Sequence, residues 1–178
     1  YGADPAQALA HAPDAVVVNS FSKYFGMTGW RLGWMVVPSE WVPVAEKLMQ
    51  NLFISASTPA QHAALACFDG AAMEIFEARR EAFRQRRDFL LPALRSLGFH
   101  IPGDPAGAFY LYADVSSLCD DSFSFAEALL EQAGVAVTPG IDFERTAPER
   151  HLRFAYTTDT GRLAEALERI RGFLAAGG

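Results

Sequence analysis

The order of apolar and polar residues predicts strands and helices in turn along the first part of the chain. Residues 15–21 form a short β-branched run after a Pro-Asp turn signal, which is typical of a buried parallel strand, and residues 31–37 indicate the next strand. Ser39, which follows Pro38, is then expected to be the N-cap of a helix. A further helix is expected from about Thr58, because a Thr-Pro start precedes an apolar segment.

The longest predicted element is a helix from about residue 71 to residue 96. Its apolar residues Phe76, Phe83 and Leu90 recur at heptad spacing, whereas its arginines fall mostly on the polar side. Pro92 lies within this segment and is expected to kink the helix, because proline cannot donate the backbone hydrogen bond of a helix interior.

Beyond Gly98 the pattern changes to shorter, mixed elements. Residues 108–115 alternate as in a half-exposed strand, and two more strands are expected at residues 135–140 and 151–157. A helix over residues 125–134 is expected to end at its terminal glycine. A final helix is predicted from apolar residues at helical spacing, namely Leu163, Leu167, Ile170 and Leu174.

Together these elements predict an α/β fold with two parts. We expect residues 1–75 to form the C-terminal part of a larger parallel α/β domain. Residues 76–178 are expected to comprise the long connecting helix and a small α+β domain, so that the boundary lies at the long helix.

Composition narrows the class of protein. The chain has 178 residues, 51% of them hydrophobic and 20% charged, which is enough to bury a substantial core in a soluble globular protein. The net charge of −6 offers no broad basic surface, so we expect no nucleic-acid partner through this chain. No window approaches the roughly twenty apolar residues of a membrane span, and the first residues lack the profile of a signal peptide. No membrane association is expected.

The two cysteines point to a compartment rather than to a site. Cys67 and Cys119 lie far apart without metal-ligand spacing, and we interpret them as packed thiols of a reducing cytoplasm.

Candidate chemistry is concentrated around Lys23, in the stretch NSFSKYFGMTGWRLGW. A lysine at the end of a buried strand is poorly explained as a solvated charge, because strand ends in α/β sheets face the ligand crevice. Its neutral amine is a nucleophile suited to Schiff-base formation with an aldehyde cofactor. Ser20, Ser22 and the guanidinium of Arg31 are donors that could anchor a phosphate. The alternative is that Lys23 is a chance loop residue and Arg31 an ion-pair partner.

The same letters also match S-x-x-K, the nucleophile motif of serine β-lactamases and penicillin-binding proteins. That interpretation requires S-D-N and K-T-G motifs further along, and neither occurs. The sequence motifs of P-loop, Rossmann, zincin and thioredoxin chemistry are absent as well.

The lysine motif S-F-S-K-x-x-x-M-T-G-W-R-L-G resembles the cofactor-lysine signature of the class I and II aminotransferases, which are fold type I pyridoxal 5′-phosphate (PLP) enzymes. Further segments resemble successive landmarks of the C-terminal half of those enzymes, in the same order: NLFISASTPAQHAAL, PAGAFYLYADV, VTPGIDF and HLRFAYT. The resemblance implies the C-terminal part of the large domain of the PLP-dependent transferase fold (aspartate aminotransferase-like), followed by a smaller α+β domain.

Roles for individual residues follow from this resemblance. It implies that Lys23 forms the Schiff base with PLP and shuttles the proton of the substrate α-carbon. Arg31 and Ser20 would hold the cofactor phosphate, with Ser22 as a weaker candidate. Arg153 matches the arginine that binds the substrate α-carboxylate, its alternative being a strand arginine paired to a nearby acid. Tyr110 could line the substrate pocket or belong to the core.

The resemblance also implies the activity and its alternatives. We expect an aminotransferase that moves the amino group between an amino acid and a 2-oxo acid. The alternatives are a PLP-dependent carbon–sulfur β-lyase and a transcriptional regulator with a PLP-sensing domain. A homodimer is expected, since the family builds its site at a subunit interface. We further expect the chain to be the C-terminal part of a larger enzyme whose preceding segment supplies the contacts to the cofactor ring.

Overall fold

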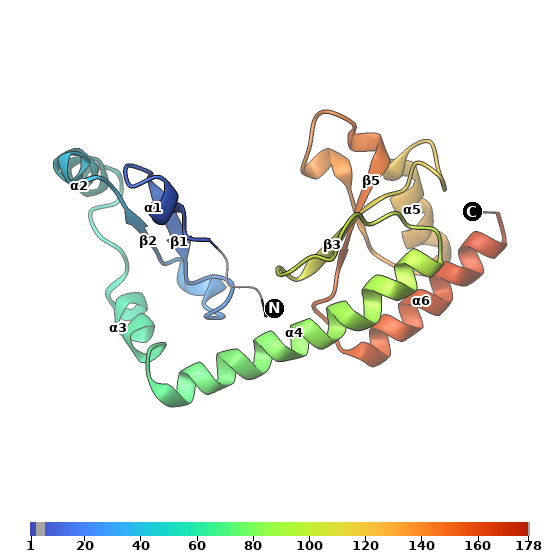
Figure 1. Ribbon diagram of the computed structural model, residues 1–178, viewed down its shortest axis with the longest axis horizontal. Coiled ribbons are helices and arrows are strands. Elements are labelled where there is room, and N and C mark those ends of the chain that lie inside the picture. The colour runs from blue at the N-terminus through green and yellow to red at the C-terminus, as the bar shows by residue number, and fades with distance from the viewer. Residues whose placement is uncertain (3–5, 178) are drawn as a thin grey trace. The chain divides into compact units, whose positions relative to one another are not determined.

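The computed structural model describes residues 1–2 and 6–177, and the chain divides into two compact units within one long helix (Figure 1). The first, here called the N-terminal unit, spans Gly2–Arg80. The second, the C-terminal unit, comprises Glu81–Gly178 together with Tyr1. The predicted domain limits at residues 75 and 76 stay a prediction, and the division between the compact units lies between Arg80 and Glu81.

The N-terminal unit combines helices with a two-stranded sheet. Strands β1 (Val17–Ser20) and β2 (Gly33–Val36) pair antiparallel, with Ser20 opposite Gly33. The prediction of a buried parallel strand at residues 15–21 is therefore wrong in both respects. The chain returns directly from β1 to β2, which places the strands antiparallel, and most of their side chains are exposed in the part of the chain that the structure describes.

The helices of this unit follow the predicted order with one correction. They are α1 (Ala8–His11), α2 (Val42–Leu52), α3 (Thr58–Ala66) and the first part of α4 (Gly70–Ser96). Ser39 is not the N-cap of α2, because a 3-10 turn over Ser39–Trp41 precedes this helix and Trp41 stands at its cap without a side-chain hydrogen bond. The start of α3 at Thr58 is confirmed.

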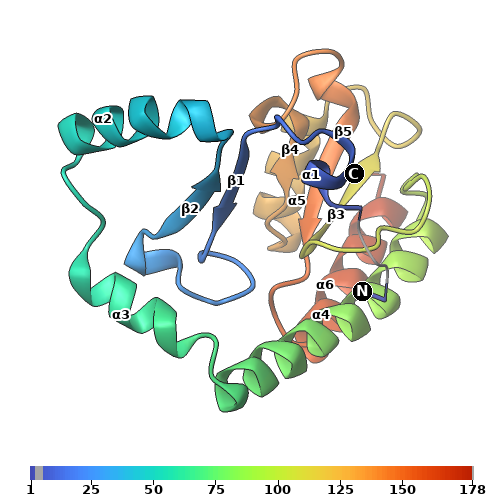
Figure 2. The same ribbon diagram turned by 60° about the vertical axis from the view of Figure 1, so that its left-hand side comes forward.

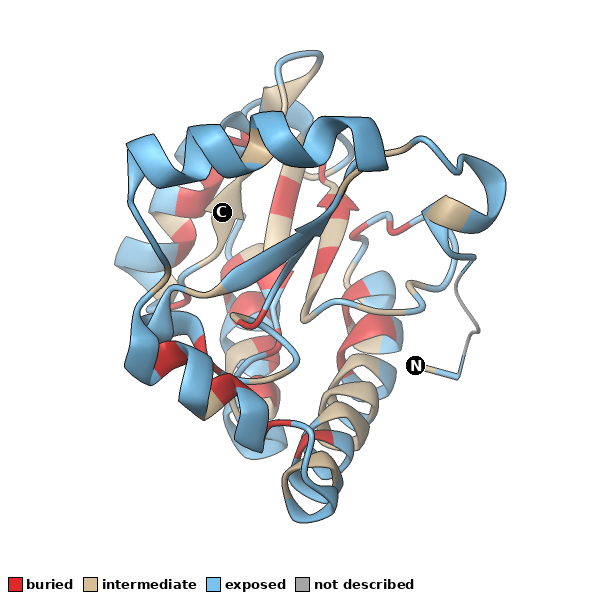
Figure 3. Ribbon diagram, turned by 90° about the vertical axis from the view of Figure 1, so that its left-hand side faces the viewer, coloured by how far each residue is buried: buried red, intermediate tan, exposed pale blue. Residues whose placement is uncertain are grey.

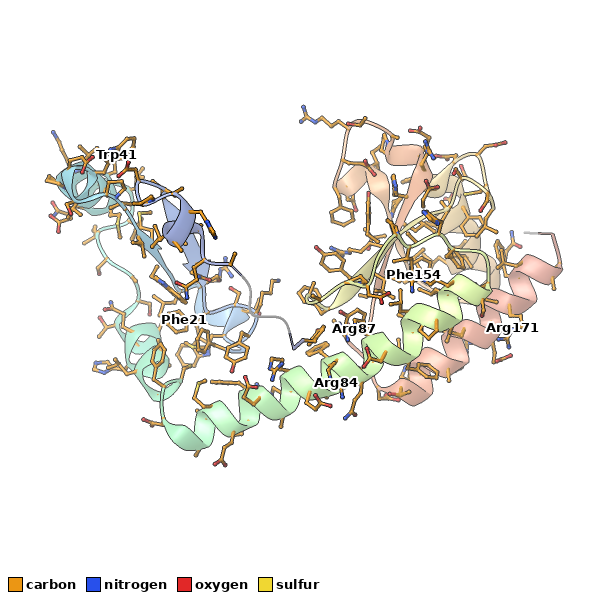
Figure 4. The ribbon with its side chains drawn as sticks, viewed as in Figure 1. Phe21, Trp41, Arg84, Arg87, Phe154 and Arg171 are labelled. Carbon is orange, nitrogen blue, oxygen red and sulfur yellow. The ribbon has the colours of Figure 1, made fainter. Side chains whose placement is uncertain are left out.

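A small core holds the segment after β1 against α3 and α4. Its buried members are Phe21, Met27, Ala64, Cys67 and Phe76. The Phe21 ring, labelled in Figure 4, lies 4.9 Å from the ring of Trp34 and is nearly fully buried. Cys67 is a free, packed thiol as expected, and burial raises its pKa above the usual value. This cluster fixes the path of the loop that carries Lys23.

The C-terminal unit is built on a three-stranded antiparallel sheet of order β3-β5-β4. Figures 1 and 2 both show the second half of α4 beside α6. The predicted strands and helices are confirmed here, with some shift of their ends. The bounds are β3 (Tyr110–Asp114), α5 (Ser122–Ala133), β4 (Thr138–Pro139), β5 (His151–Ala155) and α6 (Thr160–Ala175).

Alternation along β3 and β5 separates a core face from a polar face. Leu111 and Leu152 are fully buried, and Phe154 packs edge-on against Phe99 at 5.0 Å between ring centroids. Figure 3 shows the resulting alternation of buried and half-buried positions along these strands. Because strand side chains alternate between faces, Arg153 lies on the opposite face from its buried neighbours. The sheet therefore presents this arginine away from the core.

Helix ends in this unit follow their sequence signals. Asp121 caps α5, since its carboxylate accepts hydrogen bonds from the backbone N–H groups of Phe123 and Ser124. Gly134 ends the same helix in the left-handed conformation with φ of 64°, as predicted. Helix α4 continues through Pro92, whose expected kink stays a prediction. Among the described residues no helix is long and apolar enough to cross a bilayer.

Candidate functional site

The loop that joins β1 to β2 carries Lys23 and is fixed at both ends. At its base, the N–H of Phe21 donates to the carbonyl of Leu32 at 3.1 Å, next to the Ser20–Gly33 pair of the two strands. A Cβ atom on Gly33 would stand 2.5 Å from the carbonyl oxygen of Asn19, so only glycine fits this close approach. The ends of the loop are therefore held by backbone contacts that do not depend on exposed side chains.

Hydrogen bonds within the loop determine where its polar groups lie. The N–H of Met27 donates to the carbonyl of Phe21, and the N–H of Gly26 donates to the carbonyl of Lys23, both at 3.0 Å. The Thr28 hydroxyl donates to the carbonyl of Ser22 at 2.6 Å. Phe21 and Met27 are buried and Phe25 packs against the same cluster, whereas Lys23 is exposed.

Arg31 adopts a backbone conformation that side-chain-bearing residues rarely take. Its φ and ψ are both 52°, in the left-handed region, and its Nη1 donates to the carbonyl of Thr28 at 2.9 Å. A residue other than glycine in this region carries a conformational cost of about 1 kcal/mol or more. The guanidinium is thus held against its own loop at the expense of backbone strain, which is a common feature of ligand-binding segments.

The four residues predicted to bind the cofactor lie on or beside this one loop. Ser20 ends β1, and Ser22, Lys23 and Arg31 follow before β2 begins. The Ser20 hydroxyl accepts a hydrogen bond from the N–H of Ser22 at 3.0 Å, which keeps its own proton available for donation. Two hydroxyls, a guanidinium and a primary amine form a donor set that fits a phosphate-bearing aldehyde such as PLP.

An aromatic and charged cluster, which the sequence did not reveal, ties this loop to α4. The Tyr24 hydroxyl donates to Glu77 at 2.6 Å, and Arg80 Nε donates to the same carboxylate at 2.8 Å. The hydrogen bonds from Arg80 and Tyr24 lower the pKa of Glu77, so this carboxylate stays ionised and keeps accepting them. Tyr24 thus joins the loop to α4, with its ring 5.7 Å from that of Phe76.

The second group of predicted residues lies on the polar face of the C-terminal sheet. Arg153 occupies the middle of β5, opposite Tyr112 of β3 and Thr138 of β4. Its Nη2 donates to the Thr138 hydroxyl at 3.3 Å, and its Cζ lies 4.4 Å from the Phe143 ring and 5.5 Å from the Tyr110 ring. Cation–π contacts of this kind fix a guanidinium without neutralising it.

The charge of Arg153 has no carboxylate partner among the ion pairs of residues 1–2 and 6–177. Its Nε is buried and makes no hydrogen bond within that part of the chain. A buried donor without a hydrogen-bond partner is costly unless a ligand satisfies it. This geometry favours anion binding over the alternative of a strand arginine paired to a nearby acid.

Tyr110, whose role the sequence left open, and its neighbour Phe109 differ in their surroundings. Phe109 packs against the hydrophobic core, whereas Tyr110 is half-buried and contacts Arg153. The sequence also did not single out Phe143 and Thr138, which contact Arg153 most directly. Their signal was present in the segment VTPGIDF, but only the fold brings it beside β5.

Comparisons with known proteins agree on one family. Residues 1–170 match the model described as aminotransferase class I and II. The chain is 40% identical over 161 residues to valine–pyruvate aminotransferase of Mycobacterium tuberculosis, covering 90% of this chain and 42% of that protein. It is 41% identical over 162 residues to aspartate/prephenate aminotransferase of Thermus thermophilus, covering 89% of this chain and 41% of that protein.

Solved structures give the same result. An aminotransferase from Mycobacterium tuberculosis superposes with a TM-score of 0.92 and 38% identity, over 98% of this chain and 46% of that one. A double mutant of Thermus thermophilus aspartate aminotransferase has a TM-score of 0.88 and 38% identity, over 97% of this chain and 45% of that one. The chain spans less than half the length of these relatives.

Proposed function

Because this chain belongs to the family of class I and II aminotransferases, we propose that the whole protein moves an amino group between an amino acid and a 2-oxo acid with PLP as cofactor. The predicted fold, the C-terminal part of an aspartate aminotransferase-like structure, is confirmed by the superpositions. The relatives described above are named as transaminases, which supports transamination over the β-lyase and regulator alternatives.

The observation that carries this proposal is the loop between β1 and β2. It holds the amine of Lys23 in the same short segment as the Ser20 and Ser22 hydroxyls and the Arg31 guanidinium. The strained backbone of Arg31 and the glycine requirement at position 33 show that this segment departs from an ordinary strand connection.

Each of these side chains receives a role under the proposal. The Lys23 amine would hold the cofactor covalently and would move the proton at the substrate α-carbon. Arg31 and Ser20 hold the phosphate, and Ser22 is a weaker candidate for the same contact. When bound, the cofactor supplies an electron sink for the charge that develops at the α-carbon.

Arg153 fixes the orientation of the substrate. A bidentate pair between its guanidinium and the α-carboxylate determines which α-carbon bond is aligned for reaction. The same contact serves the amino acid and the 2-oxo acid, because both carry this carboxylate. Tyr110 and Phe143 flank the guanidinium, and we assign Tyr110 to the substrate pocket.

A cytoplasmic homodimer completes the proposal. The homodimer is motivated by the family resemblance. The cytoplasmic location is motivated by Cys67 and Cys119, which are both unpaired thiols and therefore fit a reducing compartment.

Replacement of Lys23 tests the proposal most directly. In the whole protein, we expect Lys23→Ala to lower turnover by about 1,000-fold or more, because the covalent attachment and the proton transfer are lost together. The visible absorbance of lysine-bound cofactor should disappear as well. The matched control is Lys47→Ala, which removes the other lysine from exposed α2 and should leave both signals unchanged. Retention of activity and absorbance in Lys23→Ala would contradict the assignment.

A second assay separates transamination from β-elimination. Under the proposal, product formation from an amino acid requires an added 2-oxo acid acceptor in every turnover after the first. Sustained formation of a 2-oxo acid without any acceptor would instead support the β-lyase.

A further inference from the structure

The turn that follows β4 places an aromatic ring on Arg153. The N–H groups of Phe143 and Glu144 both donate to the carbonyl of Gly140, at 2.8 and 3.0 Å. This turn brings the Phe143 ring to 4.4 Å from the guanidinium carbon of Arg153. A Cβ atom on Gly140 would stand 2.4 Å from the carbonyl oxygen of Pro148, so the turn can close only with glycine there.

The next residue, Glu144, is held by two side chains. The Tyr112 hydroxyl donates to its Oε1 at 2.6 Å, and His151 Nδ1 lies 2.6 Å from the same oxygen. His151 Nδ1 also lies 3.3 Å from the carbonyl oxygen of Ala147. Both neighbours of this nitrogen are acceptors, so Nδ1 carries a proton and donates. The Glu144 carboxylate is therefore engaged by Tyr112 and His151.

Tyr112 connects this group to Arg153 in two ways. Its backbone stands opposite Arg153 in the β3–β5 pairing, and its ring contacts Phe143 edge-on, at 6.2 Å between centroids. Its ring also stacks on His151, at 4.9 Å and 12°. Burial, together with the hydrogen bond to Glu144, raises the pKa of Tyr112 well above the usual value. The hydroxyl therefore stays protonated around neutral pH and continues to donate.

A second charged pair lies near these residues and does not involve Arg153. Asp114, at the end of β3, pairs with Arg150 at 2.9 Å and accepts hydrogen bonds from Ser116. Arg153 itself has no carboxylate among the ion pairs of the described residues, although Glu144 follows directly after the ring that covers it. Glu144 thus directly follows Phe143, the residue whose ring covers Arg153, but its carboxylate contacts Tyr112 and His151 instead of the guanidinium.

We propose that Tyr112, Glu144 and His151 are positioning residues for Arg153 and thereby determine how tightly the protein binds the carboxylate of its substrates. The inference rests on the proposed function. Tyr112 and His151 fix the Glu144 carboxylate, which holds the Phe143 turn against the guanidinium and prevents Glu144 from competing with the substrate carboxylate. None of the three side chains needs to touch the substrate.

The test compares carboxylate binding with turnover in the whole, cofactor-loaded protein. The probe is the carboxylic acid that lacks the amino group of the best amino-acid substrate, with its Kd measured by calorimetry. We expect Tyr112→Phe, which keeps the ring and removes the hydroxyl, to weaken this Kd and raise KM for both substrates by about 3- to 10-fold. Its kcat should stay within about twofold of wild type, because uniform binding is lost rather than transition-state stabilisation.

Two variants of Glu144 sharpen the result. Glu144→Gln retains an oxygen that can accept from Tyr112 and His151, so its Kd should stay within about twofold of wild type. Glu144→Ala removes the anchor and should weaken the Kd as Tyr112→Phe does, which also decides the matter if Tyr112→Phe fails to fold. The matched control is Glu165→Gln, which makes the same chemical change in the Glu165–Arg169 ion pair of α6 and should have no effect.

The outcomes separate this inference from the proposed function. A folded Tyr112→Phe with wild-type Kd, or with kcat reduced as much as kcat/KM, would overturn the positioning role while leaving transamination intact. A wild-type protein that neither transaminates nor binds the carboxylate would overturn both.

Discussion

The two groups of predicted site residues lie in different compact units and have very different supports. In the C-terminal unit, Arg153 lies on a sheet whose other face packs into a large hydrophobic core that includes Leu111, Leu129 and Leu152. In the N-terminal unit, the Lys23 loop rests on a cluster that has five buried side chains among the described residues. Arg153 is therefore supported by the large core of its own unit, whereas the Lys23 loop is supported by a small cluster together with hydrogen bonds within the loop.

The exposed apolar side chains show the same contrast. Most of the large ones in the described residues belong to the N-terminal unit, on β1, β2 and α2 and in the segment after α2. Examples are Val18, Trp34, Trp41, Leu52 and Ile54. So much exposed apolar surface is unusual for a monomeric protein and is typical of surfaces that other polypeptide covers.

The largest expected effect is on the free energy of unfolding, which should respond differently to substitutions in the two units. Leu111→Ala empties a fully buried position and should lower the free energy of unfolding by about 2–5 kcal/mol. Val18→Ala, at a side chain that is 73% exposed, should change it by about 0.5 kcal/mol or less in this chain. Urea unfolding followed by circular dichroism measures both.

The same Val18→Ala measurement in the whole protein tests whether further polypeptide covers β1. If further polypeptide covers β1 there, the cost should rise to about 1 kcal/mol or more. Equal costs for Leu111→Ala and Val18→Ala in the 178-residue chain would refute the difference in support.

The next effect concerns the different roles proposed for Arg153 and Arg31. In the whole protein, Arg153→Ala should raise KM for the amino acid by about 100-fold with cofactor still bound, because a charge-assisted bidentate contact is lost. Arg31→Ala should instead weaken retention of PLP, measured as the concentration of added cofactor needed for half-maximal activity. If Arg153→Ala released the cofactor and left KM unchanged, the roles assigned to the two arginines would be wrong.

The smallest expected effect is the loss of the N-cap of α5, which lies in the C-terminal unit and should depend on pH. Asp121→Ala should destabilise the protein by about 1 kcal/mol at pH 7, because two backbone N–H groups of α5 lose their acceptor. Hydrogen bonds from Ser124 lower the pKa of Asp121 below its unfolded value. Its contribution is therefore present above about pH 4 and is lost as the pH falls through the lower folded pKa.

Thermal unfolding at pH 7 and at pH 2 measures this loss. The wild type and Asp121→Ala should differ at pH 7 and converge at pH 2, whereas the exposed neighbour Asp120→Ala should match wild type at both. A difference that persists unchanged at pH 2 would show that the carboxylate charge is not what caps the helix.

The elements that the sequence predicted well are those whose signals are local. Gly134 ended α5, Thr58 began α3, and the alternation over residues 108–115 marked β3, because caps and side-chain periodicity act within a few residues. The parallel, buried assignment of residues 15–21 failed because strand direction and burial depend on which segment pairs with the strand, and this segment pairs with β2.

The candidate site was predictable in its charged residues and not in their surroundings. The Lys23 motif is a contiguous stretch, so Ser20, Ser22 and Arg31 could be named from it. Neither His151 nor Glu144 stood out in the sequence as a candidate site residue. Only the antiparallel pairing of β3 with β5 and the turn at Gly140 bring these side chains together with Tyr112.

The left-handed backbone of Arg31 has a consequence for variation at that position. A glycine there would relax the backbone but remove the cation, so the locally favourable substitution is opposed to the residue that the proposed phosphate contact requires. Efforts to raise thermal tolerance by repairing disfavoured torsions should leave residue 31 alone, since under the proposal relief of strain at that position would remove a contact to the phosphate.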